Sequence, residues 1–200
     1  VYRSSAAACT RYATTTGIST STIIYDIEDD GGLLWAGAHE ALYRSTNDGA
    51  SWSTIPGLSR VMTIHRFGDR LLFGTEHLGI RSTTDGGVTW EDFDDGLPTG
   101  IVQELATLEG TLFCALWSGG IYRLVGETWV PTAITSGFHQ VLQPVGPALV
   151  TQSALGEEIL YTLDEGASWS TFDEGYFGGE IYEMAVSGGH GFTNGASNAS

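Results

Sequence analysis

Short runs of apolar and β-branched residues recur along the chain, with glycine-containing turns between them. In the clearest segment, Val61–Phe67 and Arg70–Thr75 flank the dipeptide Gly68-Asp69. Runs of about four to eight residues bounded by Gly or Asp are typical of β-strands joined by tight hairpins. No segment shows the apolar spacing of an amphipathic helix over a helical length. The pattern therefore predicts an all-β protein.

The same order of runs is repeated along the sequence. A first unit contains Thr22–Ile27, Leu33–Gly37 and Leu42–Ser45; a second Val61–Phe67, Arg70–Thr75, Gly79–Ser82 and Thr89–Phe93; a third Ile101–Leu108, Thr111–Leu116 and Gly120–Leu124; a fourth Gln140–Val145, Ala148–Gln152 and Glu158–Thr162; and a fifth Ile181–Val186 and Gly191–Asn194. The alternation of apolar and polar residues is loose, as expected for sheets that pack on both faces.

A turn sequence, Ser/Thr-x-Asp/Asn-x-Gly-x-Ser/Thr-Trp, also repeats. It occupies residues 45–52, 83–90 and 162–169, and a shorter form without the Asp occupies 124–129. The Asp or Asn side chain can accept hydrogen bonds from nearby backbone N–H groups, and Gly can adopt φ > 0. The Trp is expected to fill the hydrophobic layer. The structural positions are thus Asn47, Gly49 and Trp52; Asp85, Gly87 and Trp90; Trp129; and Asp164, Gly166 and Trp169.

The spacing of these turns predicts the architecture. Their Trp residues stand at positions 52, 90, 129 and 169, a period of 38 to 40 residues. A period of about 40 with strand-type residues is typical of β-propeller blades. We predict one five-bladed propeller over residues 1–200, with blades at about 19–57, 58–97, 98–137 and 138–178. The fifth blade would combine 179–200 with 1–18, with Tyr12 in place of the Trp, so that the paired chain ends close the ring. A fragment of a larger propeller is the main alternative.

The repeated turn resembles the Asp-box, or BNR repeat. This repeat is found in sialidase-like propellers, xyloglucan-degrading glycosidases, sortilin-type receptors and photosystem II assembly factors. The resemblance extends over nearly the whole chain, including Leu72–Thr75 and Gly79–Ser82 ahead of the second turn. It implies a propeller whose Asp-boxes lie on the face opposite the ligand. It implies little about function, because these families do unrelated things.

The charge excludes some partners. Acidic residues number 24 against 8 basic ones, all of them Arg, which gives a net charge of −16. Such a chain is not expected to bind nucleic acid or an anionic membrane surface, and no run of apolar residues is long enough for membrane insertion.

The cysteines and the two ends of the sequence give information on the cellular compartment of the protein. Cys9 and Cys114 fall in non-adjacent blades, so no disulfide is expected, and Cys114 is expected in the core. Neither a signal peptide nor an initiator Met is present, which suggests processing from a longer precursor. Asn198-Ala199-Ser200 fits a glycosylation sequon. We predict an acidic protein that is secreted or at the cell surface.

The candidate ligand-binding residues follow from the repeat. His39 and His77 stand four residues after Trp35 and Phe73, and Trp117 stands four after Phe113. Loops between the second and third strands of adjacent blades would therefore bring together His39, Glu40, Glu76, His77 and Trp117. Aromatic faces and carboxylates suit sugar rings, and His with Glu also suits a divalent metal such as zinc. The alternative is that these are polar loop tips kept by repeat ancestry.

The connections between blades add further acidic residues. Glu91–Asp95, Asp173–Phe177 and Glu180 place carboxylates beside aromatic rings, a composition compatible with calcium or a sugar. No spacing resembles an EF-hand loop. We therefore predict no cofactor and no metal site, with calcium as the one ion that the composition suggests.

No catalytic residue is predicted. A sialidase needs clustered arginines, but Arg3, Arg44, Arg81 and Arg123 lie on repeat strands and only Arg60 is well placed. A glycoside hydrolase that uses two carboxylates stays open, with Glu40, Glu76, Asp94 and Glu180 as candidates. The sequence has no Ser/His/Asp signature, cysteine metal spacing or phosphate-binding loop.

The function that we predict is a non-catalytic extracellular propeller that binds a glycan or protein ligand or serves as a scaffold. One alternative is a structural subunit of an extracellular assembly, which could self-assemble into filaments. The other is the glycoside hydrolase.

Overall fold

The computed structural model confirms the all-β prediction. It describes residues 2–5, 8–11, 16–139, 141–152, 158–171, 180–187 and 190–196, with side chains for 16–139, 141–152 and 158–171. Every regular element within these ranges is a β-strand. No helix in the described residues has the length and apolarity to cross a membrane.

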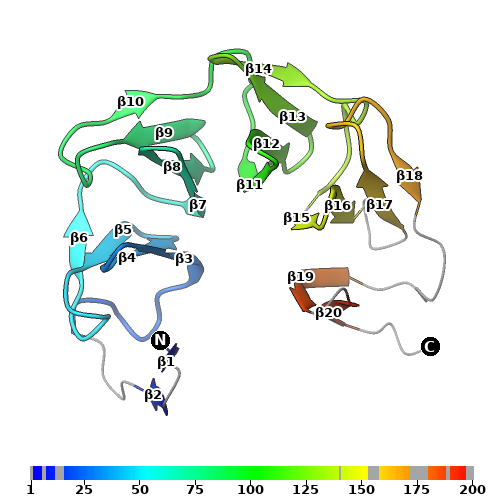
Figure 1. Cartoon of the computed structure of the whole chain (residues 1–200). Helices are drawn as coiled ribbons and strands as arrows, with labels where there is room; N and C mark the ends of the chain where they lie inside the picture. Colours follow the sequence, from blue (N-terminus) through cyan, green and yellow to red (C-terminus); the bar gives the residue numbers. More distant parts are fainter. Residues whose placement is uncertain are drawn as a thin grey trace.

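Four antiparallel sheets of four strands each form an open arc (Figure 1). In chain order, blade one is β3 (Ile24–Asp30), β4 (Leu33–Ala38), β5 (Leu42–Ser45) and β6 (Ser53–Ile55); blade two is β7 (Val61–Phe67), β8 (Arg70–Thr75), β9 (Ile80–Thr83) and β10 (Glu91–Asp92); blade three is β11 (Val102–Leu108), β12 (Thr111–Leu116), β13 (Gly120–Val125) and β14 (Thr128–Pro131); and blade four is β15 (Leu142–Val145), β16 (Ala148–Gln152), β17 (Ile159–Thr162) and β18 (Ser170–Thr171). The first strand of each blade faces the centre of the arc and the last lies at the rim (Figure 1).

The strands lie close to the runs that the sequence predicts. The largest difference is in β3, which runs over Ile24–Asp30 and not Thr22–Ile27. Asp30 pairs with Leu33, so only Gly31 and Gly32 form the hairpin turn. Their φ angles of 63° and 102° are those that a two-residue turn between twisted strands requires.

The predicted closure of the ring is not present. β1 (Tyr2–Ser5) pairs with β2 (Ala8–Arg11), and β19 (Glu180–Ser187) pairs with β20 (His190–Ala196), as two separate two-stranded sheets. These hairpins stand at opposite ends of the arc (Figure 1). The repeat period could not determine this, because closure depends on contacts between opposite ends of the chain, which carry the largest loop-closure entropy. A count of five blades stays a prediction, and Tyr12 lies outside the described residues.

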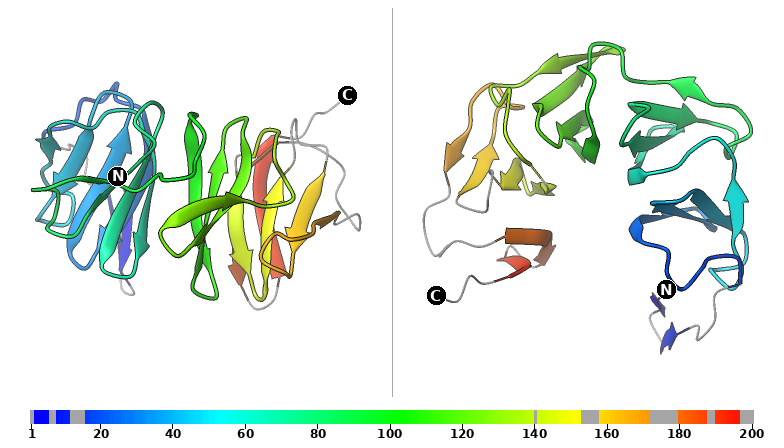
Figure 2. Two further views of the ribbon diagram at one scale, coloured as in Figure 1. Left: turned by 90° about the horizontal axis from the view of Figure 1, so that it is seen from above. Right: turned by 180° about the vertical axis from the view of Figure 1, so that it is seen from behind.

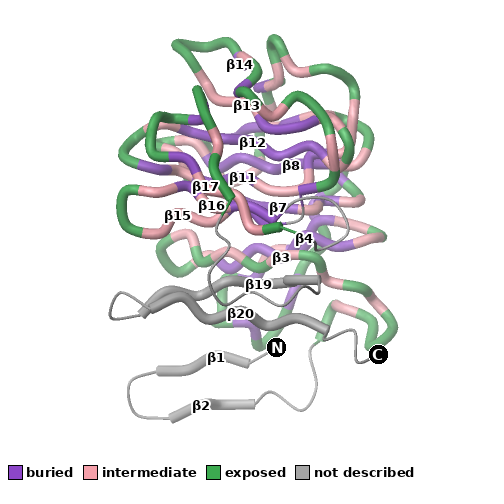
Figure 3. Tube along the Cα trace, turned by 90° about the vertical axis from the view of Figure 1, so that its right-hand side faces the viewer, coloured by how far each residue is buried: buried purple, intermediate pink, exposed green. Residues whose placement is uncertain are grey.

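The core consists of apolar layers between neighbouring blades. Trp35, Leu42, Val61 and Phe73 are buried between blades one and two, and comparable layers separate blades two, three and four. Buried residues concentrate on the middle strands of each sheet, and exposed ones at the turns (Figure 3). Cys114 is fully buried, as predicted for a core residue. The side chain of Cys9 lies outside the described residues.

The repeated turns are held together by their own side chains. In blade two, Asp85 accepts hydrogen bonds from the Thr83 hydroxyl at 2.8 Å, from the Thr89 amide at 2.9 Å and from the Thr89 hydroxyl at 2.6 Å. Gly87 has a φ of 84°. Equivalent bonds involve Ser45, Asn47 and Ser51 in blade one and Thr162, Asp164 and Ser168 in blade four. We call these segments the box turns.

The repeated arginines connect the blades at this end of the strands. The Arg44 Nη1 atom donates to the Gly86 carbonyl oxygen, in the box turn of the next blade, at 2.5 Å. Arg123 in blade three likewise reaches Glu165 in the box turn of blade four, at 2.9 Å. Arg81 pairs with Asp92 of its own blade, since the turn that follows in blade three is the shortened one.

The ends of the strands form two distinct faces (Figure 2). The box turns and the hairpins between the first and second strands lie at one end, which we call the box face. The loops between the second and third strands and the connections between blades lie at the other end, which we call the loop face.

Candidate functional site

Three of the predicted ligand-binding residues meet at the junction of blades one and two on the loop face. Arg60, in the connection between these blades, pairs through Nη1 with Glu76 Oε2 at 2.5 Å. The other Glu76 oxygen lies 3.5 Å from His77 Nε2. The Arg60 amide donates to the His39 carbonyl at 3.3 Å, and the Glu76 amide donates to the Arg60 carbonyl at 3.0 Å. We call His39, Arg60, Glu76 and His77 the polar cluster.

The charges in the polar cluster are matched. The hydrogen bond from Arg60 is the main cause that lowers the pKa of Glu76 below its usual range, and the nearby histidines add to it. Arg60 has a φ of 51°, an uncommon conformation for a residue other than glycine. Asp48, Glu109 and Glu165 adopt the same conformation in turns on the box face, so the conformation alone does not mark a site.

The sequence analysis missed one member of this region, Tyr25 on β3. Its hydroxyl lies 2.9 Å from Nδ1 of His39, so it orients that ring. Tyr25 is 37% exposed, and its neighbours Ile23 and Ile27 are 58% and 42% exposed at this end of the arc. The residue lies within a predicted strand, but the cross-strand partner of a side chain beside a bulge cannot be deduced from alternation.

The structure does not bring Glu40 and Trp117 into the polar cluster. Glu40 is exposed. Trp117, in the loop between β12 and β13, packs edge-on against Phe138 with ring centroids 4.5 Å apart. Phe138 belongs to the connection between blades three and four, so this aromatic pair marks a different junction.

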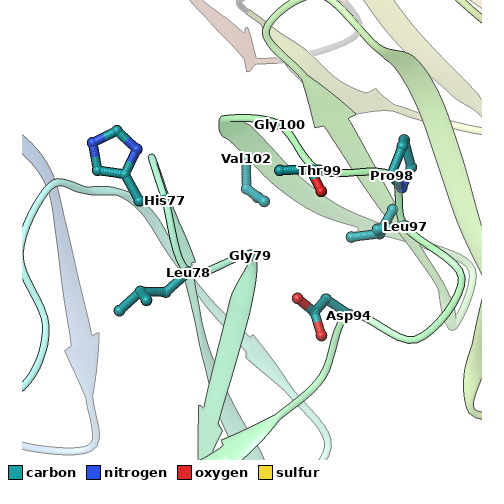
Figure 4. Close-up of a pocket in the computed structure, with 9 residues that line it drawn as sticks. All are labelled: His77, Leu78, Gly79, Asp94, Leu97, Pro98, Thr99, Gly100 and Val102. Atoms are coloured by element: carbon teal, nitrogen blue, oxygen red, sulfur yellow. The ribbon is translucent and has the colours of Figure 1, made fainter.

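A small pocket adjoins the polar cluster at the junction of blades two and three. It has a volume of about 140 Å³ (Figure 4). Its lining comes from the β8–β9 loop (His77, Leu78, Gly79), the β10–β11 connection (Asp94, Leu97, Pro98, Thr99, Gly100) and the first residue of β11 (Val102). His77 thus belongs to both the polar cluster and the pocket.

The structure describes the side chains of only the first of the predicted acidic connections. Glu91–Asp95 leads into the pocket, and Asp94 lines it. Residues 173–177 lie outside the described residues, as does the side chain of Glu180 on β19. Among the described side chains, no group of three or more His, Cys, Asp and Glu is placed to hold a metal ion.

Two half-buried carboxyl groups near the loop face were also missed. Asp26 accepts a hydrogen bond from the Ile64 amide at 2.6 Å, and burial raises its pKa. Burial, with a smaller effect of Asp26, raises the pKa of Glu104 to about 8. Both residues follow a bulge at the start of an inner strand, β3 or β11, and only the packing of neighbouring blades buries them.

No family model matches this sequence, and no curated protein matches it. The fold does have solved counterparts. The designed Ika8 protein superimposes with a TM-score of 0.68 at 10% identity, over 90% of this chain and 58% of Ika8. The GH74 xyloglucanase from Xanthomonas campestris gives 0.64 at 16% identity, over 83% of this chain and 34% of the enzyme. The extracellular domain of a hybrid two-component system from B. thetaiotaomicron gives 0.59 at 13% identity, over 89% of this chain and 31% of that domain.

These comparisons show the β-propeller fold. The chain spans between about a third and somewhat over half of each of these structures. They comprise a designed protein, an enzyme and an extracellular domain, so the fold alone does not assign an activity.

Proposed function

We propose that this propeller is a non-catalytic binding module whose loop face takes a glycan or protein ligand. The observation that carries this proposal is the polar cluster, in which side chains from two blades and their connection are fixed by one another. A fixed constellation of polar groups loses little conformational entropy when a ligand binds, which favours affinity.

Within the polar cluster, the Glu76 carboxyl is better suited to binding than to the acid role in hydrolysis. A two-carboxylate glycosidase needs one carboxyl that stays protonated as the acid. Arg60 instead holds Glu76 in its ionised form, as the lowered pKa of that carboxyl indicates. An ionised carboxylate beside imidazole rings is a hydrogen-bond acceptor for hydroxyl, amide or ammonium groups of a ligand.

We further propose that the protein acts outside the cell, as a secreted or surface-bound domain of the Asp-box type. The excess of 24 acidic over 8 basic residues and the extracellular neighbour support this. The same surface charge argues against nucleic acid as the ligand.

The test is a binding and cleavage screen with the full chain and a panel of oligosaccharides and extracellular protein fragments. Intact ligand that is retained by the wild type and lost by the double variant Glu76→Gln/His77→Ala supports the proposal. A double variant at the other loop-face junction, Trp117→Ala/Phe138→Ala, serves as the matched comparison. Cleaved sugar would favour the glycoside hydrolase, and stable oligomers without any ligand would favour the structural subunit.

A further inference from the structure

The carboxylate of Asp94 differs from its neighbours in the β10–β11 connection. Glu91 pairs with Arg70 at 2.9 Å, Asp92 pairs with Arg81, and Asp95 accepts a hydrogen bond from the Thr128 hydroxyl at 3.1 Å. Within the described part of the chain, the Asp94 carboxylate has neither a hydrogen bond nor an ion pair. It lines the pocket instead.

The position of Asp94 is built into the backbone around it. Its Oδ2 atom lies 1.9 Å from the point that a Cβ atom on residue 79 would occupy, which is too close for any residue with a Cβ unless the carboxylate moved. Gly79 has a φ of 62°, so the loop needs glycine both for its conformation and for the approach of Asp94. Figure 4 shows the Asp94 side chain near Gly79 among the residues that line the pocket.

The remainder of the pocket lining is mixed, with His77 and Thr99 beside several apolar side chains. Leu97, Pro98 and Val102 come from the connection and from β11, and Leu78 from the facing loop. The pocket volume of about 140 Å³ is well below the range of roughly 300–1,000 Å³ typical of small-molecule sites. A space of this size suits one inserted side chain.

We propose that this pocket takes the side chain of a lysine from a partner protein, with the alkyl stem along Leu97 and Val102 and the ammonium on Asp94. Lysine combines an apolar stem with a charged tip, which matches the Leu97 and Val102 side chains beside one unpaired carboxylate. A sugar ring fits less well, because the pocket has no Trp, Tyr or Phe to stack on. The inference rests on the proposed function, since it assigns the ligand class of the same loop face.

No cation with a described side chain is free to pair with Asp94. The chain contains no Lys. The six arginines with described side chains are all engaged: Arg44 with the Gly86 carbonyl, and Arg60, Arg66, Arg70, Arg81 and Arg123 with carboxylates. With a net charge of −16, the protein surface would attract a cationic partner.

The experiment uses the ¹⁵N-labelled full chain and four small probes followed by amide chemical shifts. The probes are Nα-acetyl-lysine methylamide, its Nε-acetylated form, Nα-acetyl-arginine methylamide and methyl glucosaminide. The lysine probe should shift the amides of Gly79, Thr99 and Gly100 in a saturable way, and added NaCl should weaken it. The acetylated probe should bind about tenfold more weakly or not at all, because it lacks the charge.

The variant Asp94→Asn keeps the side-chain shape and removes the charge, so it should weaken the lysine probe about tenfold. Asp69→Asn removes the same charge from the β7–β8 hairpin on the box face and should leave binding unchanged. Thermal melts of both variants control for folding.

The inference fails if the acetylated probe binds as well as lysine, or if Asp94→Asn has no effect. Tighter binding of methyl glucosaminide than of lysine would also overturn it, since it would assign an amino sugar. If the ligand panel shows binding that depends on Glu76 and His77 while the lysine probe shifts nothing, only the lysine assignment fails. If neither the panel nor the probe binds, both proposals fail.

Discussion

The carboxyl groups of the box turns and those at the start of the inner strands have pKa values that are shifted in opposite directions. On the box face, hydrogen bonds from hydroxyl and amide groups of the turn, those of Thr89 and Ser168 first, lower the pKa of Asp85 and Asp164 to about 2. Toward the loop face, burial raises the pKa of Asp26, and it raises that of Glu104 to about 8. Ionisation of carboxylates therefore stabilises the box turns and costs free energy at Asp26 and Glu104, whereas on the loop face the hydrogen bond from Arg60 lowers the pKa of Glu76.

This difference separates fold from function. The polar groups of each box turn form hydrogen bonds within the same turn, so the same sequence gives the same structure in several blades. The loop face instead contains the charge pair of Arg60 with Glu76, which joins a blade to the connection before it, and the unpaired carboxylate of Asp94. Costly features of this kind are typical of binding sites, which trade stability for function.

The largest effect is expected from the Trp129→Ala variant. Trp129 is 2% exposed, and its indole N–H donates to the Phe93 carbonyl at 2.8 Å. Its truncation should cost about 3–5 kcal/mol of unfolding free energy, measured by urea denaturation. Trp90→Ala should cost clearly less, because Trp90 is only half-buried. Equal losses would mean that the shortened turn of blade three is no more tightly packed than a complete one.

The Glu104→Gln variant tests the free-energy cost of ionising a carboxyl group near the loop face. Between the ordinary pKa of 4.5 and the raised value of about 8, the unfolded carboxyl is ionised while the folded one keeps its proton. The folded state then binds more protons, so this residue's contribution to stability falls as pH rises through that window. The variant should gain stability relative to wild type, on the order of 2–4 kcal/mol by pH 8.

Urea unfolding of wild type and Glu104→Gln at pH 5, 6.5 and 8 measures this gain. The difference between the two proteins isolates Glu104 from the other titrating groups. Asp69→Asn, at an exposed hairpin, controls for the removal of one carboxylate from the surface. A constant difference across the pH range would contradict the prediction that the Glu104 carboxyl stays protonated in the folded state.

The Asp85→Asn/Asp164→Asn double variant tests the box face, where the dependence of stability on pH should have the opposite sign. Because the folded pKa values are depressed to about 2, these groups stabilise fully above the ordinary value of 3.8 and lose that effect as pH falls toward 2. The drop in urea midpoint between pH 5 and pH 2.5 should be smaller in the variant. At pH 7 the turns should persist, since Asn47 already makes equivalent bonds in blade one at 2.9 to 3.0 Å.

The smallest change in stability is expected from the Glu76→Gln/His77→Ala double variant. The Arg60 and His77 side chains are 38% and 68% exposed, so solvent weakens these pairs. The melting temperature should move by no more than about 2 °C, while ligand binding on the loop face is lost. A large drop in melting temperature together with intact binding would reverse the roles that we assign to the two faces.

The sequence by itself determined the elements and their order. Runs such as Val61–Phe67, Arg70–Thr75 and Thr111–Leu116 coincide with β7, β8 and β12. The repeat also placed His39 and His77 in equivalent loops. Strands and tight turns depend on residues a few positions apart, and the same local pattern occurs in several repeats of this sequence.

Only the tertiary structure decided how the blades meet. The pairing of Arg60 with Glu76 spans 16 residues, and the described strands β1–β2 and β19–β20 at the chain ends form separate sheets, although the period predicted that they would pair. The unpaired state of Asp94 and the raised pKa of Glu104 depend on which groups neighbouring blades bring close and on how much water they exclude. Desolvation and charge pairing between blades are properties of packing, and a repeat pattern read along one chain does not contain them.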